Sequence, residues 1–163
     1  MIRVDQAGEY GAVRIYAGQR AVMGDRHPFA VEIQRMADQE AAHKAAFDAM
    51  IPARRVRPTL LQPLWHVAGY ALGAATALIG PKAAMACTVA VETEIDRHYA
   101  AQLAQLGDEE PALRETIAQF QAEELEHKAT ALDLGAEQAV AYPLLSGMIR
   151  AGCRLAIRLS ERL

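Results

Sequence analysis

Two Glu-x-x-His motifs supply residue types that bind iron or manganese ions in proteins. Glu40 and His43 form the first motif, and Glu124 and His127 form the second. A spacing of three residues places both side chains of a motif on one face of a helix. Because that face is otherwise apolar, we expect each carboxylate and imidazole to point into a protein core. The neighbouring Glu123 shares its face with polar residues, so we predict that Glu123 lies on a solvated surface.

Two more acids interrupt apolar stripes in other segments of the chain. Glu9 lies at helical spacing from Val13, and Glu92 lies on a stripe of apolar residues spaced by three and four. Glu94 shares its face with Arg97 and with small or polar residues, so we select Glu92 as the inward acid of this segment. The sequence therefore predicts four inward acids and two inward histidines.

The four acids repeat at matched distances along the chain. Glu9 and Glu40 are 31 residues apart, and Glu92 and Glu124 are 32 residues apart. The two acids of each pair also lie almost equally far from a glycine between them, at which the first helix is expected to end. An antiparallel hairpin would therefore bring them to the same depth. This symmetry predicts a duplicated helix hairpin in which each half contributes one Glu and one Glu-x-x-His motif.

Four carboxylates that converge in an apolar core need cations, because burying an isolated charge is very unfavourable. Four Glu and two His match the ligand set of paired iron or manganese ions in ferritin-like four-helix bundles. We therefore predict a dinuclear metal site, and its expected ligands are Glu9, Glu40, His43, Glu92, Glu124 and His127.

Glycine and proline residues divide the chain into helical segments. The expected helices cover residues 5–24, 28–51, 81–107, 111–135 and 143–161, with a broken helix inside 59–80. Asp5 is the expected N-cap of the first helix, and Pro52 is expected to stop the second. No segment alternates as a strand does, so we predict an all-α protein with one ferritin-like domain over residues 1–163.

The composition excludes some classes of protein. Hydrophobic residues make up 52% of the chain, enough for a core without disulfides, and the net charge is −3. Such a charge lacks the basic field of nucleic-acid-binding proteins, so we expect no nucleic-acid partner. Cys87 and Cys153 form no Cys-x-x-Cys pair, and we predict that both are reduced thiols in the core.

The stretch 59–80 between the two halves contains no charged residue. It approaches the length of about 20 residues that crosses a bilayer, but glycines and prolines interrupt it. We predict an apolar segment that faces a membrane, with basic residues nearby at Arg54, Arg55 and Arg57. A second basic stripe lies on the C-terminal helix at Arg150, Arg154, Arg158 and Arg162 and suits anionic headgroups or a partner protein. The alternative is a core helix and a solvated arginine face.

Four blocks of sequence resemble the demethoxyubiquinone hydroxylase family of ubiquinone biosynthesis. The blocks are DQAGEYGAVRIYAGQ at 5–19, MACTVAVE at 85–92, EELEHKATALD at 123–133 and AGCRLAIRLSERL at 151–163. The resemblance implies a di-iron monooxygenase that hydroxylates the ring of demethoxyubiquinone or its quinol. The family's six metal positions fall on the six residues predicted above, and Glu92 and Glu124 could bridge the irons together with Glu40. Thr93 departs from the family, which often has a second Glu there.

The resemblance also implies reactants, partners and a location. The reactants are O₂, a polyprenyl quinone and, as a reductant, NADH, although the chain has no dinucleotide-binding fingerprint. A lipid-binding protein of the same pathway is an implied partner. His98 and Tyr99 are implied to deliver electrons or protons, whereas packing and surface roles are the alternative. We expect a peripheral protein on the cytoplasmic face of a bacterial inner membrane, or on the matrix face of the mitochondrial one if a presequence was removed.

Three other functions share part of this pattern. A ferritin or rubrerythrin-like iron-handling protein has the same ligands but does not need the uncharged segment. A membrane quinol oxidase has the ligands and the lipid attachment, but different sequence blocks. A non-enzymatic bundle would bind no metal, and replacing Glu40 or Glu124 by Ala would then stabilise it by removing a buried acid.

Overall fold

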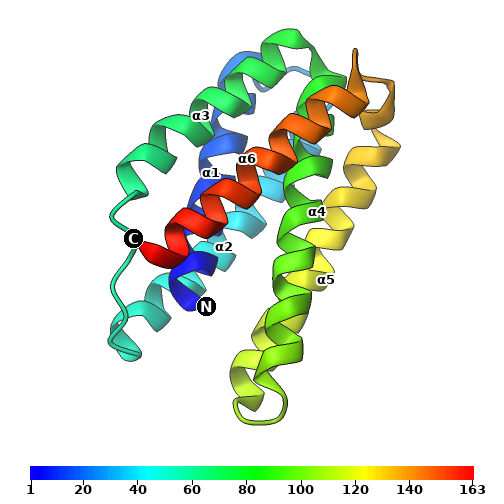
Figure 1. Ribbon diagram of the computed structural model, residues 1–163. Coiled ribbons are helices and arrows are strands. Elements are labelled where there is room, and N and C mark those ends of the chain that lie inside the picture. The colour runs from blue at the N-terminus through cyan, green and yellow to red at the C-terminus, as the bar shows by residue number, and fades with distance from the viewer.

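The computed structural model describes all 163 residues and is entirely helical (Figure 1). Six α-helices and one short 3₁₀ helix follow one another: α1 (Ile2–Met23), α2 (Ala30–Ala53), α3 (Gln62–Ile79), α4 (Pro81–Leu106), α5 (Pro111–Asp133), η1 (Ala136–Gln138) and α6 (Tyr142–Arg162). This confirms the predicted all-α class and is consistent with a ferritin-like bundle. None of the helices combines the length and apolar character that spanning a bilayer requires.

Three local predictions were wrong. The segment expected to be a broken helix forms one continuous helix, α3, because its glycines are packed against α1 and leave the helix intact. Asp5 does not cap α1, which begins at Ile2; Asp5 is instead buried inside the first turns. Pro52 lies within the last turn of α2, which continues to Ala53. A proline in the last turn loses one helical hydrogen bond and does not by itself end the helix.

Two helix hairpins form the centre of the molecule. Helix α1 packs against α2, and α4 packs against α5, so each half of the predicted duplication is an antiparallel pair. In Figure 1 the α1–α2 pair lies on one side and the α4–α5 pair on the other. The remaining helices cover the outside of the bundle, with α3 on α1 and α6 on α4.

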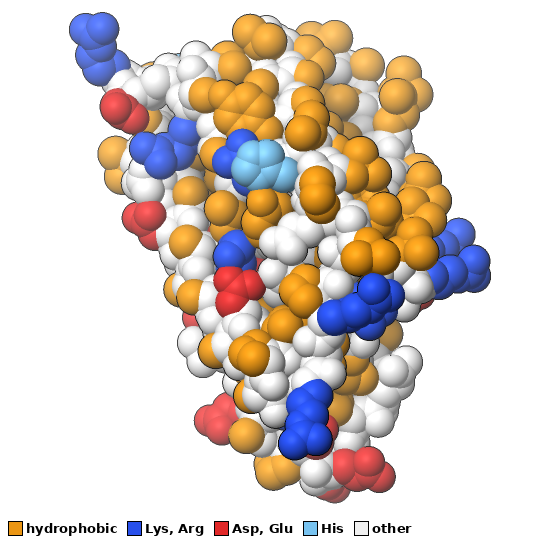
Figure 2. Space-filling view, turned by 90° about the vertical axis from the view of Figure 1, so that its left-hand side faces the viewer, with side chains coloured by type: hydrophobic (Ala, Val, Ile, Leu, Met, Phe, Trp, Pro, Cys, Tyr) orange, Lys and Arg blue, Asp and Glu red, His pale blue; other side chains and the backbone are white.

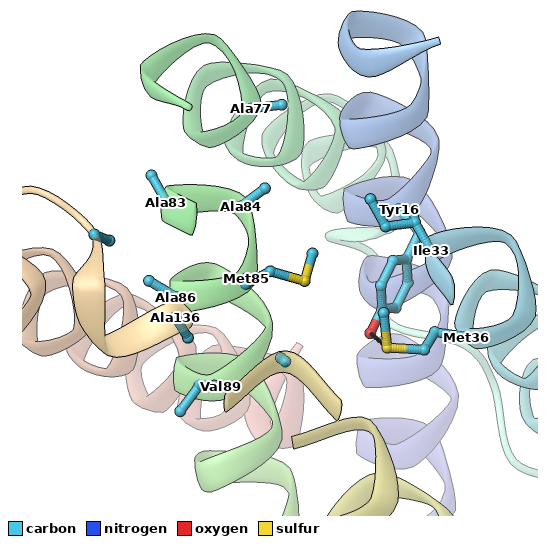
Figure 3. Close-up of a cluster of buried hydrophobic side chains, with 12 residues drawn as sticks. Tyr16, Ile33, Met36, Ala77, Ala83, Ala84, Met85, Ala86, Val89 and Ala136 are labelled. Atoms are coloured by element: carbon cyan, nitrogen blue, oxygen red, sulfur yellow. Dashed lines mark hydrogen bonds between the residues drawn. The ribbon is translucent and has the colours of Figure 1, made fainter. Parts of the chain in front are cut away.

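The largest apolar cluster closes one end of the bundle. It contains Tyr16 of α1, Ile33 and Met36 of α2, and a group of small residues at the start of α4. Figure 3 shows Met85 of α4 pointing toward Tyr16 and Met36, so the two hairpins meet there through apolar side chains. A second cluster around Phe47 and Phe120 packs the other end. The polar side chains described next lie between these two clusters.

Candidate metal centre

Each of the four bundle helices brings acids or histidines to one buried region. Glu9 comes from α1, Glu40 and His43 from α2, Glu92 from α4, and Glu124 and His127 from α5. All six residues are at most 1% exposed. The structure therefore brings together the six residues that the sequence singled out as metal ligands.

The six side chains form two overlapping groups. Ligand atoms of Glu9, Glu40, His43 and Glu124 lie within 4.8 Å of one another, and so do those of Glu40, Glu92, Glu124 and His127. Glu40 and Glu124 belong to both groups, which is the arrangement expected of bridging carboxylates. Glu92, which we expected could also bridge, belongs to one group alone.

Both imidazoles direct Nδ1 toward the acids. His43 Nδ1 lies 3.0 Å from Glu124 Oε1 and 3.5 Å from Glu9 Oε2. His127 Nδ1 lies 3.2 Å from Glu40 Oε1 and 3.2 Å from Glu124 Oε2. Each Nδ1 is thus surrounded by carboxylate oxygens at the place where a shared cation would lie.

The pKa values reflect the crowding of acids. Burial raises the pKa of Glu40 and Glu92 well above the usual value, and the neighbouring Glu124 charge raises both further. Burial also raises the pKa of Glu9. For Glu124, burial acts in the same direction, but hydrogen bonds from His127 and His43 outweigh it and lower its pKa to about 2. Without a cation, the centre therefore keeps Glu124 ionised and favours protons on the other acids.

The chemistry of the donor set fits two metal ions. Four buried oxygens of the cluster accept no hydrogen bond: Glu9 Oε2, both oxygens of Glu40, and Glu92 Oε2. Buried carboxylate oxygens normally accept hydrogen bonds. Four that accept none, close together, indicate that cations would bind to them. Four carboxylates and two imidazoles favour iron or manganese. Calcium takes oxygen ligands alone, and many zinc sites are rich in cysteine sulfur, so this ligand set suits neither as well.

Tyr99 contacts the centre, and the neighbouring His98 belongs to a second polar cluster. The Tyr99 hydroxyl donates a hydrogen bond to Glu9 Oε1, and Tyr99 is fully buried. His98 Nε2 lies 2.9 Å from Asp5 Oδ1, and Gln102 donates to the same carboxylate oxygen. The His98 side chain is 18% exposed, so this cluster lies between solvent and the buried acids.

Three polar residues near the centre had roles that the sequence did not reveal. The Tyr16 hydroxyl donates a hydrogen bond to Glu92 Oε1 over 3.2 Å. Glu123 was predicted to be solvated; it is 27% exposed, and its Oε2 lies 2.7 Å from His43 Nε2. Gln39 Oε1 lies 3.0 Å from His127 Nε2. Gln39 and Glu123 each directly precede the inward Glu of a motif, and this shared position could have indicated their role near the centre.

Glu94, set aside in favour of Glu92, is also buried, with its side chain 1% exposed. Its Oε1 accepts hydrogen bonds from Arg150 Nε at 2.7 Å and from an Arg154 amino group at 2.8 Å. Glu94 thus points away from the metal-centre acids and joins α4 to α6. Two of the four arginines of the predicted basic stripe, Arg150 and Arg154, therefore donate hydrogen bonds to an internal acid.

An apolar cavity of about 580 Å³ shares two helices with the centre, but none of the six predicted ligands lines it. Residues of α1, α3, α4 and α6 line it, and sixteen of its 22 lining residues are hydrophobic. Gly8 and Gly11 lie next to Glu9 and Tyr10 in the chain, and Val91 is adjacent to Glu92, so the cavity wall and the cluster of acids share two helices. Cys153 lies in this wall and Cys87 is buried nearby. Both are free thiols, as predicted, but only Cys87 is fully buried, and Cys153 is half-buried.

Comparisons with known proteins agree over almost the whole chain. The family model described as "Ubiquinone biosynthesis protein COQ7" matches residues 1–160. The 3-demethoxyubiquinol 3-hydroxylase of Rhodospirillum rubrum is 58% identical over 161 residues, which cover 99% of this chain and 76% of that protein. The mitochondrial NADPH-dependent 3-demethoxyubiquinone 3-hydroxylase of Homo sapiens is 54% identical, over 100% of this chain and 76% of the relative. The mitochondrial 5-demethoxyubiquinone hydroxylase of Saccharomyces cerevisiae is 44% identical, with 100% and 77% covered.

Proposed function

This chain belongs to the COQ7 family of ubiquinone biosynthesis proteins, and we propose from that premise that it is a 3-demethoxyubiquinol 3-hydroxylase. Its reaction inserts one atom of O₂ into a ring C–H bond of a polyprenyl demethoxyubiquinone or demethoxyubiquinol. The other oxygen atom leaves as water, with two electrons and two protons taken from a reductant. The chain is thus an oxygen-incorporating oxidoreductase, as the names of its relatives indicate.

The convergence of six buried ligands from four helices carries the proposal of a metal centre. Two iron ions bound there would activate O₂ and pass electrons to it, which is the chemistry that ring hydroxylation needs. We assign Glu40 and Glu124 as shared ligands, Glu9 and His43 to one position, and Glu92 and His127 to the other. Complete burial of these groups keeps water away from the reaction.

Tyr99 and His98 are proposed to carry protons or electrons toward the centre. Tyr99 is bonded to the proposed ligand Glu9, and the next residue toward solvent, His98, is bonded to Asp5. The proposed reductant is a reduced nicotinamide nucleotide. Several relatives are named NADPH-dependent, and NADH is the form that the sequence resemblance suggested.

The apolar cavity and the exposed face of α3 are proposed to receive the polyprenyl substrate. Large hydrophobic side chains are exposed on and around this helix, at Leu60, Leu64, Val67, Leu78 and Ile79. Figure 2 shows many hydrophobic side chains on that side of the molecule, with Lys and Arg side chains among them and at the edges. An apolar face with basic side chains on and around it suits a surface helix that lies in the headgroup region of a membrane.

We place the protein at the surface of a quinone-containing membrane. For a bacterial chain this would be the cytoplasmic face of the inner membrane. The relatives of animals and yeast are named mitochondrial, and for a mitochondrial chain it would be the matrix face of the inner membrane. A lipid-binding protein of the same pathway is the proposed partner that delivers the substrate.

Anaerobic loading with ferrous iron tests this function. The chain should bind two irons and, after addition of O₂, NADH and a demethoxyubiquinol, should release the hydroxylated quinol identified by mass spectrometry. Glu124→Ala should lose both metal and product, whereas Glu115→Gln, an exposed acid on the same helix, should retain both. Two bound irons without any hydroxylated product would leave a metal-binding bundle and reject the enzyme activity.

A further inference from the structure

The outer nitrogens of the two metal-facing histidines each meet a residue from the opposite motif. His43 Nε2 on α2 lies 2.7 Å from Glu123 Oε2 on α5. His127 Nε2 on α5 lies 3.0 Å from Gln39 Oε1 on α2. Glu123 and Gln39 each directly precede the Glu of a Glu-x-x-His motif. The two halves of the duplicated bundle thus reach across to each other in the same way, but with different side chains.

These contacts determine which nitrogen of each ring carries a proton. A carboxylate accepts hydrogen bonds, so Nε2 of His43 must donate to Glu123. Gln39 Oε1 also accepts a hydrogen bond from an Arg35 amino group at 2.7 Å, and a guanidinium can donate but not accept. Arg35 therefore fixes the orientation of the Gln39 amide, and Nε2 of His127 must donate to it. In both rings Nδ1 faces the acids and, without a metal, donates a hydrogen bond to Glu124. A bound metal would replace that proton, whereas Nε2 would keep its own.

We propose that Glu123 and Gln39 are positioning residues that make the two metal positions unequal, with the position at His43 binding its ion more tightly. This inference rests on the proposed metal centre and assigns it two residues outside the set of six ligands. Both residues act through a histidine and contact no reacting atom. The position at His43 also includes Glu9, and the position at His127 also includes Glu92.

The difference in charge between the two acceptors is the physical reason. An imidazole that donates to a carboxylate becomes a stronger metal ligand through its other nitrogen, because the acceptor stabilises the partial positive charge on the ring. The Gln39 amide is neutral, and its oxygen already accepts a hydrogen bond from the Arg35 cation. It is therefore a weaker acceptor for the proton on His127 Nε2. Glu32 and Glu126 partly neutralise Arg35 at the surface, so its main effect is to orient the amide.

Isolating each metal position allows a direct test with cobalt(II), a spectroscopic substitute for ferrous iron. Glu92→Ala leaves the position at His43 intact, and Glu9→Ala leaves the position at His127 intact. Glu123→Gln should weaken cobalt binding at His43 by roughly tenfold and leave the His127 position unchanged. Gln39→Glu should strengthen the His127 position and leave the other unchanged. The combined exchange, Glu123→Gln with Gln39→Glu, should reverse the order of the two affinities.

Controls and opposite outcomes separate this inference from the proposed function. Glu115→Gln and Gln105→Glu make the same changes at exposed positions and should leave both affinities unchanged. Equal affinities at the two positions, or a loss at both positions from either substitution, would overturn the unequal roles while the metal centre stands. A folded chain that binds no cobalt at either position would overturn the metal centre and this inference together. Circular dichroism identifies any variant that has not folded.

Discussion

At the scale of single residues, the centre is a group of buried acids whose charges oppose one another. Burial raises the pKa of Glu9, Glu40 and Glu92, the Glu124 charge raises these pKa values further, and His43 offsets only part of the increase at Glu9. A cation would replace protons on these groups, so metal binding and proton release are linked. The stability of the metal-free chain must therefore depend on pH.

The first prediction is that the metal-free chain becomes less stable as pH rises. Burial lowers the pKa of His43, but its contacts with the Glu124 and Glu9 carboxylates outweigh this and raise it from 6.5 to about 10. A raised pKa stabilises the folded state below the unfolded value, and this contribution is lost as pH rises through the folded value. Denaturant titrations with a chelator present should show a falling free energy of unfolding from pH 6.5 to pH 10.

The acids with raised pKa values contribute in the same direction, since their protonated forms also favour the folded chain. Glu124 has the opposite sign, but its contribution is lost between its unfolded pKa of 4.5 and about 2, outside this interval. Iron-loaded protein should instead bind metal more tightly as pH rises, because the ligands lose protons on binding. A free energy of unfolding that increases from pH 6.5 to pH 10 would contradict the description of the centre.

The second prediction concerns Tyr99, whose hydroxyl is bonded to Glu9. Tyr99→Phe should retain two irons but slow turnover by about 10- to 100-fold, the usual effect of removing a group bonded to a metal ligand. Stopped-flow reduction of the loaded protein and iron analysis separate delivery of electrons from loss of metal. Tyr10→Phe, which alters an exposed hydroxyl bonded to His66, is the matched control. Unchanged reduction in Tyr99→Phe would leave Tyr99 a packing residue.

At the scale of helices, α3 is held against α1 by close contact of the two backbones. A Cβ added at Gly73 would overlap the carbonyl oxygen of Ile15, and one added at Gly18 would overlap that of Tyr70. The absence of side chains at these positions lets the helices approach more closely than larger residues would permit. This packing explains why a segment rich in glycine forms an intact helix.

The third prediction follows from this contact. Gly73→Ala should destabilise the protein by about 1–3 kcal/mol, because the added methyl group forces α3 away from α1. Gly8→Ala is the matched control, since a Cβ at Gly8 would meet no atom within 4 Å. There, the higher helix propensity of alanine should stabilise α1 by up to about 1 kcal/mol. The melting temperature should therefore fall in Gly73→Ala and rise in Gly8→Ala. A higher melting temperature in Gly73→Ala would contradict the close contact.

The attachment of α6 to α4 depends on Glu94 in a comparable way. The Glu94 carboxylate accepts from Arg150 and Arg154 on α6 and from Arg97 on its own helix. The arginines are between one third and two thirds exposed, so they would regain water if Glu94 were removed. Removing the Glu94 carboxylate should therefore lower the free energy of unfolding only moderately.

The fourth prediction is that Glu94→Ala costs about 1–3 kcal/mol and loosens α6, since charged hydrogen bonds of this kind contribute that much. Hydrogen exchange should become faster in α6 and remain unchanged in α2 and α5. Glu161→Gln, which alters an exposed acid on α6 itself, should change neither property. Equal exchange in α6 of the parent chain and Glu94→Ala would show that apolar contacts alone hold the helix.

At the scale of the whole molecule, the buried acids and histidines lie in a different part of the protein from the exposed apolar surface. The polar chemistry is enclosed between the two hairpins, whereas exposed hydrophobic side chains gather on and around α3 and α6. Figure 2 shows this unequal distribution on the α3 side of the molecule. A protein that acts on a polyprenyl lipid has a physical reason for such a surface, because the tail of the substrate favours an apolar environment.

The fifth prediction tests this surface. The chain should sediment with anionic liposomes, and the double variant Leu60→Ser with Leu64→Ser should bind at least about tenfold more weakly, since each exposed leucine loses its transfer into lipid. Leu125→Ser, which changes an exposed leucine of α5, should leave binding unchanged. Binding that is equal in all three proteins would exclude this face as the site of membrane contact.

Local spacing predicted much of this molecule. Residues three and four positions apart must share a helix face, so polar residues inside apolar stripes identified all six side chains that converge in the structure. Equal distances from a turn predicted the hairpins for the same reason, because every helical residue advances the chain by a constant rise. The family resemblance could also be recognised from the sequence, because the matching blocks extend through the chain.

Only the tertiary structure decided which polar faces are covered. Helix α4 packs against α3, α5 and α6 as well as α1, so it has more than one buried face, and an apolar stripe alone could not reveal the burial of Glu94. Likewise, Glu123 and Gln39 meet the histidines of the opposite hairpin, about 80 to 90 residues away in the chain. Helical periodicity determines which residues share a face, but the identity of the facing helix depends on how the whole chain packs.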